Sequence, residues 1–269
     1  MTANTDHRPT YRVTLRRVVR SEWTKLRTLR STWITLGVAA LLTVGLSGAF
    51  GYGYNAAIQA GEVQPTTAEG LDAAFLALDL YALVIGVFGI LQMSGEYGSG
   101  MIRASLAAVP RRLPLLWAKA LVLVAVTGVL SLLVCLASFL VSQSFAGADG
   151  AALGDPGVAR AILGAAAYPV AMGLLGLGLG AILRHTATAI TMFVAALLLV
   201  PAMLEAALSK SMEDTVMPYV PVVAGQAMYA LEPNGPFKML SAGAGGAVLA
   251  AYVFAVLAGG TALLWRRDA

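Results

Sequence analysis

Six long apolar stretches run through this chain of 269 residues, and each is long enough to cross a membrane as a helix. A hydrocarbon core of about 30 Å needs about 20 consecutive apolar residues in helical form. Backbone amides and carbonyls find no water there, so each stretch must satisfy its own hydrogen bonds, as a helix does. The stretches are Trp33–Tyr52, Leu71–Met93, Leu113–Val141, Ala161–Leu183, Ala187–Leu208 and Ala242–Trp265. The predicted fold is an all-α polytopic membrane protein with six transmembrane helices.

The basic residues lie almost entirely on one side of these stretches. Fifteen of the 18 Lys and Arg residues lie before the first stretch, between the second and third or just inside the third, between the fourth and fifth, or after the sixth. The exceptions are Arg160, Lys210 and Lys238. Because loops rich in Lys and Arg stay in the cytoplasm, both termini are predicted to be cytoplasmic. The net charge of +4 then reflects topology and attraction to anionic lipid, and calls for no nucleic-acid partner.

Ahead of the first span, residues 1–9 are predicted to be disordered and residues 10–32 to form an amphipathic helix. The apolar residues recur at intervals of three and four, which places them on one helix face. They are Tyr11, Leu15, Val18, Val19, Trp23, Leu26 and Leu29, and the opposite face carries Arg12, Arg16, Arg20 and Arg27. Such a helix beside a span is typical of one lying in the inner membrane interface, with Trp23 at headgroup depth. The alternative is a solvated helix whose charges hold the chain at the membrane.

The segment after the second span, Ser94–Arg103, contains three glycines in six residues, namely Gly95, Gly98 and Gly100. This composition predicts that the helix stops there and that the chain turns sharply. A short helix over Ala104–Ala108 is expected next, before the third span.

Residues 208–241, between the fifth and sixth spans, form the longest extramembrane segment. The segment holds four prolines but also apolar residues such as Val220 and Met228. Because a solvated linker would be more polar, this segment is predicted to fold back as short re-entrant helices at the outer mouth. On the same side, Thr66 and Glu69 have the spacing of a capping box that opens the second helix. Asp79, near the outer end of that helix, either lines a polar entrance or reaches water.

Small polar residues share one face of the third span, because they recur at spacings of three and four. They are Thr127, Ser131, Cys135, Ser138 and Ser142. In lipid such residues usually face another helix, and the alternative is that they line a substrate path. The fourth span carries Gly173, Gly176, Gly178 and Gly180, which favours close helix packing.

The sequence lacks the motifs of the usual membrane enzymes and ion-coupled transporters. It contains no G-x-x-x-x-G-K-[ST], no H-E-x-x-H and no G-x-S-x-G. With two histidines, His7 and His185, and a single cysteine, no metal site or disulfide is expected. The centres of the spans lack the ionisable residues that ion coupling uses. The chain is therefore not expected to be an enzyme, and the energy for uphill transport is expected from a partner.

Two segments and the topology resemble the permease subunits of the ABC-2 class of ATP-driven exporters, above all the small, separately encoded permeases of actinobacteria. Residues 21–33, SEWTKLRTLRSTW, are similar to the start of these permeases. Residues 95–103, GEYGSGMIR, are similar to their segment after the second span, although Met101 stands where the family commonly has Thr. The resemblance covers the whole chain.

The resemblance implies that the segment at about 94–112 is a coupling element that docks on a separate cytoplasmic ABC ATPase. The residues implied at or near that contact are Glu96, Tyr97, Gly98, Gly100, Ile102 and Arg103. Glu96 and Arg103 would fix the geometry of the turn or pair with the ATPase. The basic helix would be the family's elbow helix, near the same ATPase, with Arg16, Arg20, Trp23, Lys25 and Arg27 as its marked residues.

The function implied is a permease subunit in a bacterial plasma membrane that moves a hydrophobic or amphipathic substrate outward, such as a drug, a peptide antibiotic or a lipid-like molecule. Two permeases, identical or paralogous, would join two ATPase subunits that bind ATP and Mg. This chain would bind no cofactor itself, and membrane lipids would be its other partners. The alternative is a membrane sensor or scaffold that recruits a cytoplasmic partner.

Overall fold

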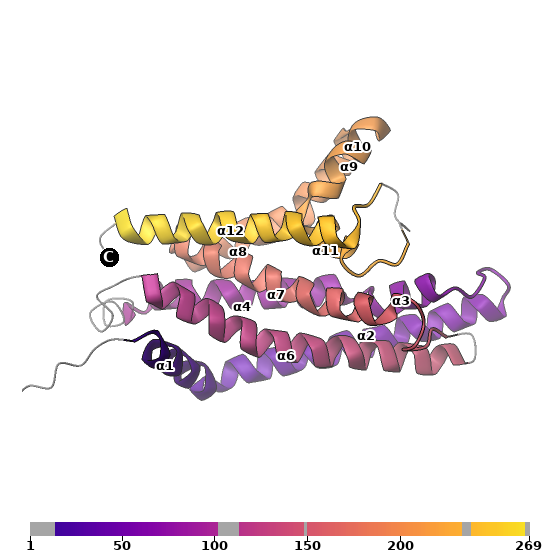
Figure 1. Cartoon of the computed structure of the whole chain (residues 1–269), viewed down its shortest axis with the longest axis horizontal. Coiled ribbons are helices and arrows are strands. Elements are labelled where there is room, and N and C mark those ends of the chain that lie inside the picture. Colours follow the sequence, from indigo (N-terminus) through magenta and orange to yellow (C-terminus); the bar gives the residue numbers. More distant parts are fainter. Residues whose placement is uncertain (1–13, 102–112, 148–149, 233–237, 267–269) are drawn as a thin grey trace, which may run out of the picture.

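The computed structural model describes residues 14–101, 113–147, 150–232 and 238–266, and all the regular structure within these residues is helical (Figure 1). Six of its segments are long and apolar enough to span a membrane. They are Arg30–Gln59, Leu78–Gly98, Pro114–Ala146, Val158–Leu183, Thr186–Ala207 and Ala242–Trp265. The prediction of an all-α, six-span fold is confirmed.

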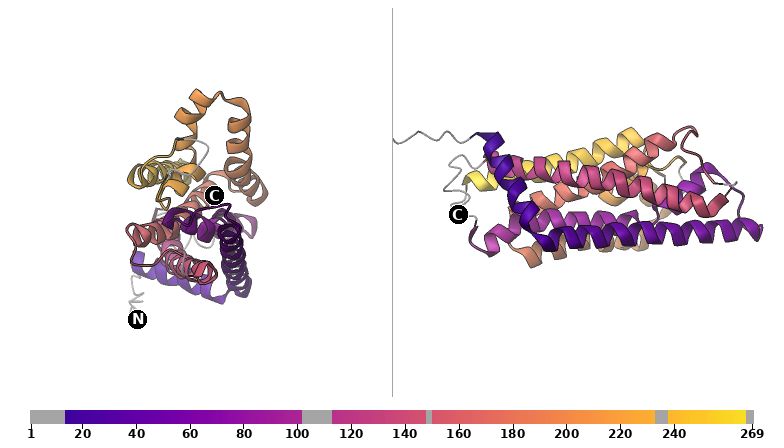
Figure 2. Two further views of the ribbon diagram at one scale, coloured as in Figure 1. Left: turned by 90° about the vertical axis from the view of Figure 1, so that its right-hand side faces the viewer. Right: turned by 90° about the horizontal axis from the view of Figure 1, so that it is seen from below.

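One end of the bundle, called the elbow end below, gathers the start of α2 (Arg30–Gln59), the end of α4 (Leu78–Gly98), the start of α6 (Leu113–Ala146) and the end of α12 (Ala242–Arg266) (Figure 1). The helix α1 (Leu15–Thr28) crosses this end steeply, whereas the long helices run nearly parallel (Figure 2). The opposite end is called the far end. The described basic residues that the sequence places in the cytoplasm lie at the elbow end.

The amphipathic helix α1 ends at Thr28 rather than at the predicted residue 32, because Leu29 breaks it before α2 begins. Its buried residues, Val18, Glu22 and Leu26, follow one another at intervals of four and pack toward α6. Trp23 and Leu15, which the apolar pattern places on the same face, are 41% and 46% exposed. The apolar side of α1 is therefore divided between the bundle and the surface. Residues 1–9, predicted to be disordered, and residues 10–13 of the predicted amphipathic helix lie outside the described part of the chain.

The second predicted span differs from the expectation at both ends. A separate helix, α3 (Thr67–Phe75), precedes α4, and Thr66 Oγ1 accepts the Glu69 N–H, so this cap opens α3 rather than the span. At the elbow end, α4 continues beyond the predicted Met93 and ends at Gly98, and the chain turns at Gly100, where φ is +71°, in agreement with the predicted stop and turn within Ser94–Arg103. The last turn of α4 includes Gly95 and Glu96, and the ion pairs of Glu96, described below, hold this turn.

The helices α4 and α7 (Val158–Leu183) pack with their backbones in contact. A Cβ added at Gly89 of α4 would overlap the carbonyl oxygen of Gly173, and one added at Gly176 would overlap that of Gly86. Gly180 faces the backbone of Ile90 in the same way. Small residues permit this close approach, which increases van der Waals contact between helices in lipid.

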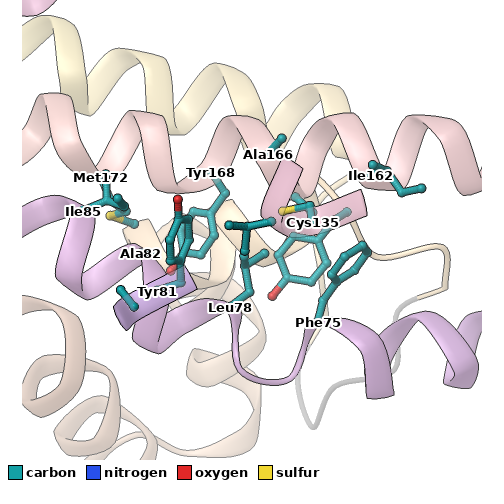
Figure 3. Packing of buried hydrophobic residues seen from close by; sticks show 14 of the residues in the cluster. Phe75, Leu78, Tyr81, Ala82, Ile85, Cys135, Ile162, Ala166, Tyr168 and Met172 are labelled. Atoms are coloured by element: carbon teal, nitrogen blue, oxygen red, sulfur yellow. The ribbon is translucent and has the colours of Figure 1, made fainter. Parts of the chain in front are cut away.

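The core lies where α3, α4, α6 and α7 meet. Its largest fully buried side chains include Tyr81 of α4 and Tyr168 of α7, and the free thiol of Cys135 is buried beside them (Figure 3).

The fifth span is interrupted. The helix α8 (Thr186–Val194) passes through a π-helical turn, Ala195–Leu199, into α9 (Val200–Ala207). Pro201 lacks an N–H and its ring crowds the carbonyl four residues earlier, which accounts for the wider turn. After it, α9 and α10 (Lys210–Val216) project from the bundle (Figures 1 and 2).

The chain then returns to the bundle through a 3-10 turn, Met217–Tyr219, and α11 (Pro221–Ala227), which packs against α7 and α12. These short elements occupy the segment 208–241, of which residues 233–237 lie outside the described part.

Candidate functional site

Four charged side chains from three helices meet at the elbow end and are called the elbow cluster. Glu22 and Lys25 come from α1, Glu96 from the last turn of α4 and Lys119 from the start of α6. Lys119 Nζ lies 2.6 Å from Glu22 Oε2 and 2.7 Å from Glu96 Oε1. Lys25 Nζ lies 2.7 Å from Glu22 Oε1 and 2.9 Å from Glu96 Oε1. Each ammonium group therefore bridges both carboxylates.

Three of these side chains are buried, since Glu22, Glu96 and Lys119 are 7%, 8% and 4% exposed, whereas Lys25 is 31% exposed. Buried charges are costly unless they are paired and hydrogen-bonded, and here two positive charges face two negative ones. Removing one partner of a buried pair costs about 3–5 kcal/mol, because the other charge is left uncompensated. The elbow cluster thus ties α1 to α4 and α6.

Lys25 closes the elbow cluster on its more exposed side and precedes the first span. Burial alone would lower the pKa of its ammonium group, but hydrogen bonds to Glu22 and Glu96 and their negative charges outweigh burial, so the pKa of Lys25 is raised. A raised pKa means that this interaction is fully present at neutral pH. Its contribution to stability is lost only when the pH rises through the folded-state pKa.

Tyr97 fixes the end of α4 on a second side. The guanidinium of Arg184 lies over the Tyr97 ring, 5.1 Å from its centroid, an attractive cation–π arrangement. Arg184 Nη2 also donates a hydrogen bond to the carbonyl of Leu263 on α12, at 3.3 Å. The short turn between α7 and α8, where Arg184 has a positive φ of 58°, therefore connects α4 to the last helix.

Two of the residues implied at the coupling contact, Gly98 and Gly100, are exposed immediately beyond the elbow cluster. Ile102 and Arg103 lie outside the described residues, as does the expected helix Ala104–Ala108. Of the two roles considered for Glu96, fixing the turn or pairing with the ATPase, its buried position and its two lysine partners suit the first.

The marked residues of the elbow helix fall into two groups. Arg16, Arg20 and Arg27 are exposed, and so is Trp23. Lys25 instead turns toward the bundle and joins the elbow cluster.

Sequence reasoning missed Glu22 and Lys119. In the sequence, Lys119 contributed only to the count of cytoplasmic basic residues, and no role was predicted for Glu22. The available signal is the cost of an unpaired buried charge. Glu22 stands between Val18 and Leu26 on one helix face, and Lys119 lies inside an apolar run, so each needs an opposite charge nearby.

A second polar group lies at the far end, around Asp79. The hydroxyl of Tyr168 donates to Asp79 Oδ1 and the amide of Gln226 donates to Asp79 Oδ2, both at 2.8 Å. Arg160 of α7 donates to the carbonyls of Met228 and Ala230, just beyond α11. Asp79 therefore fastens the returning segment to α4 and α7, a role that neither expectation for it included.

Replacing Tyr168 by phenylalanine is expected to lower the free energy of unfolding by about 1.5–3 kcal/mol, the typical value for a hydrogen bond to a charged group. Denaturant unfolding in detergent micelles, followed by circular dichroism, measures the change. Tyr219, which is 54% exposed, supplies the matched control Tyr219→Phe. Equal, small effects of the two substitutions would contradict a structural role for the Asp79 contacts.

The small polar face of the third span lies against neighbouring helices. Thr127, Ser131 and Ser138 are each at most 1% exposed. Thr127 donates to the carbonyl of Leu123 in its own helix, and Ser131 donates to the hydroxyl of Tyr81 on α4, at 3.4 Å. The structure thus places this face at a contact between helices.

The fold defines a multi-pass membrane protein whose first helix is anchored on the bundle by a buried charge cluster. The chain matches the family model described as ABC-2 family transporter protein over residues 18–195. It therefore belongs to the ABC-2 transporter family, and the resemblance inferred from the two motifs is confirmed. A search of curated proteins found no match. ABC-2 permeases are the membrane components of ABC transporters and associate with an ABC ATPase, and the matched region includes the whole elbow cluster.

Proposed function

We propose that this chain is the permease subunit of an ATP-driven exporter in a bacterial plasma membrane, and that the elbow cluster transmits movement from a separate ATPase to the spans. The observation that carries the proposal is the position of Glu96. It stands in the last turn of α4, directly before the segment expected to dock on the ATPase, and it is ion-paired to α1 and α6. A displacement of that segment would therefore move three helices together.

In this mechanism ATP and Mg close a pair of ATPase subunits, which draws the coupling segments together. Two permease chains, identical or paralogous, complete the transporter. The permease contributes different contacts to the substrate in its two states, and ATP shifts the balance between them by that difference. The segment 208–241, fastened at Asp79, would act as a lid over the exit.

The expected substrate is hydrophobic or amphipathic and leaves the cytoplasm or the inner leaflet. Two features of the surface support this class. A cavity of about 800 Å³ lies between α1, α2, α4 and α6, and a groove of about 1070 Å³ runs between α6, α7 and α12. Both are walled mainly by apolar side chains.

Affinity purification from the native membrane, followed by mass spectrometry, tests the proposal first. The expected result is a stoichiometric ATPase with a phosphate-binding loop. A folded permease that reproducibly brings no ATPase with it would favour the sensor or scaffold role instead.

Replacing Glu96 by glutamine in the assembled complex is expected to reduce substrate-stimulated ATP hydrolysis about tenfold, the effect of about 1.4 kcal/mol of lost coupling. The ATPase should still co-purify, because the side chain of Glu96 is buried and is not part of the docking surface. Glu205→Gln, at an exposed position on α9, is the control and should leave stimulation unchanged. Normal stimulation in Glu96→Gln would show that the elbow cluster does not couple the subunits.

Cysteine labelling tests the proposed orientation, in which both termini are cytoplasmic. The single native thiol, Cys135, is buried and should react poorly. A membrane-impermeant maleimide is expected to label Glu62→Cys, at the far end, in intact cells. It should label Ser99→Cys, at the elbow end, only after permeabilisation. The reverse pattern would contradict the orientation.

A further inference from the structure

We propose that the cavity between α1, α2, α4 and α6 binds a zwitterionic phospholipid that carries a primary ammonium group. The cavity has a volume of about 800 Å³ and a polar end formed by the elbow cluster. Its apolar side is formed mainly by one face of α4, including Val84, Val87, Phe88 and Leu91. This combination of a charged end and an apolar wall suits an amphiphile. The proposal concerns the permease alone and does not depend on an ATPase or on transport.

Two polar atoms in the lining lack a hydrogen-bond partner within the described part of the chain. They are Glu96 Oε2 and Gln92 Nε2, one helical turn apart on α4. The Glu96 side chain is only 8% exposed, so bulk water hardly solvates it. An unsatisfied buried polar group destabilises the folded protein, and a charged one does so more strongly. Both residues line the same cavity, so a bound molecule with a hydrogen-bond donor and an acceptor can serve both once the two side chains turn toward it.

The elbow cluster determines the charge that such a molecule should carry. Its two lysines and two glutamates cancel, so a ligand without net charge leaves the balance intact, whereas a net charge would be partly desolvated without a counter-ion. An ammonium group with N–H donors suits the free carboxylate oxygen of Glu96. A phosphate suits the amide of Gln92, and the positive charge of Lys25, which also lines the cavity, attracts it.

The apolar wall extends along the helix toward the middle of the bundle. The spacing of three and four residues from Val84 to Leu91 places these side chains on one face of α4. From Val84 to Glu96 the helix rises by about 18 Å at 1.5 Å per residue. An acyl chain can lie along much of this length while its headgroup contacts the elbow cluster.

Native mass spectrometry of the delipidated full chain tests the specificity. The probes are phosphatidylethanolamine, phosphatidylcholine and phosphatidylglycerol with identical acyl chains. Phosphatidylethanolamine is expected to bind at least about tenfold more tightly than the other two, because the choline ammonium has no N–H and the glycerol headgroup has no ammonium. Equal binding of the three lipids would overturn the proposal.

The variant Gly95→Leu tests the location without altering the elbow cluster. Gly95 lines the cavity, and a Cβ added there meets nothing within 4 Å, so the leucine side chain can enter the empty space. Gly53→Leu is the matched control, because Gly53 is also a helical glycine with open space and does not line the cavity. Gly95→Leu should lose the preference for phosphatidylethanolamine and Gly53→Leu should retain it. Unchanged binding in Gly95→Leu would refute this location. These measurements need no ATPase. A negative result would therefore refute the lipid site and leave the exporter function untouched, and a missing ATPase would refute the exporter function and leave the lipid site untouched.

Discussion

Replacing Lys119 by methionine is expected to lower the free energy of unfolding by about 3–5 kcal/mol, the largest effect of a single substitution that we predict. The ammonium group of Lys119 contacts both Glu22 and Glu96, and all three side chains are buried. After the substitution, two buried carboxylates share the single ammonium of Lys25. Equilibrium unfolding in mixed micelles, followed by tryptophan fluorescence, measures the loss, and Trp23 on α1 lies close enough to report detachment of this helix.

Two further variants identify the cause of that loss. Lys238→Met removes a charge from an exposed position outside the spans and should change stability by less than about 0.5 kcal/mol. The double variant Lys119→Met, Glu96→Gln removes one charge of each sign, so it should be more stable than Lys119→Met alone. A cost below about 1 kcal/mol for Lys119→Met would mean that the elbow cluster is not a structural connection.

Replacing Gly89 by alanine is expected to destabilise the protein by about 1–3 kcal/mol, because the added methyl group overlaps the carbonyl oxygen of Gly173. The obstacle is backbone, so α4 and α7 must separate. Thermal unfolding in detergent measures the change.

The matched control is Gly45→Ala, in the interior of α2, where a Cβ meets nothing within 4 Å. This substitution should stabilise the helix by about 0.5–1 kcal/mol, because alanine loses less backbone entropy than glycine. Opposite signs at the two glycines are the expected result. A neutral or stabilising Gly89→Ala would show that α4 and α7 are not packed backbone to backbone.

The ends of the second span show what local sequence patterns predict and what they miss. The capping box at Thr66 was read correctly as a helix start, but it opens α3 and not the span. The glycines of Ser94–Arg103 predicted a helix stop, and α4 does end among them, at Gly98, but it passes through Gly95 first. A glycine lowers helix propensity by only about 1 kcal/mol, which the buried ion pairs of Glu96 outweigh.

At the far end, too, local sequence patterns predicted only part of the structure. The sequence indicated that the segment after the fifth span folds back, because it is too apolar for a solvated linker. Its attachment, however, depends on Asp79 and Gln226, which are 147 residues apart. No local pattern identifies two residues so distant as partners.

The sequence by itself determined the number of spans, the helical class and the family, because apolar run length, charge distribution and short motifs are local properties of a chain in lipid. Only the tertiary structure decided which charges meet. Glu22 and Lys119 are 97 residues apart, and they become partners only because α1 packs across α6. Burial makes their pairing energetically necessary, and burial is a property of the packed helices, not of either segment alone.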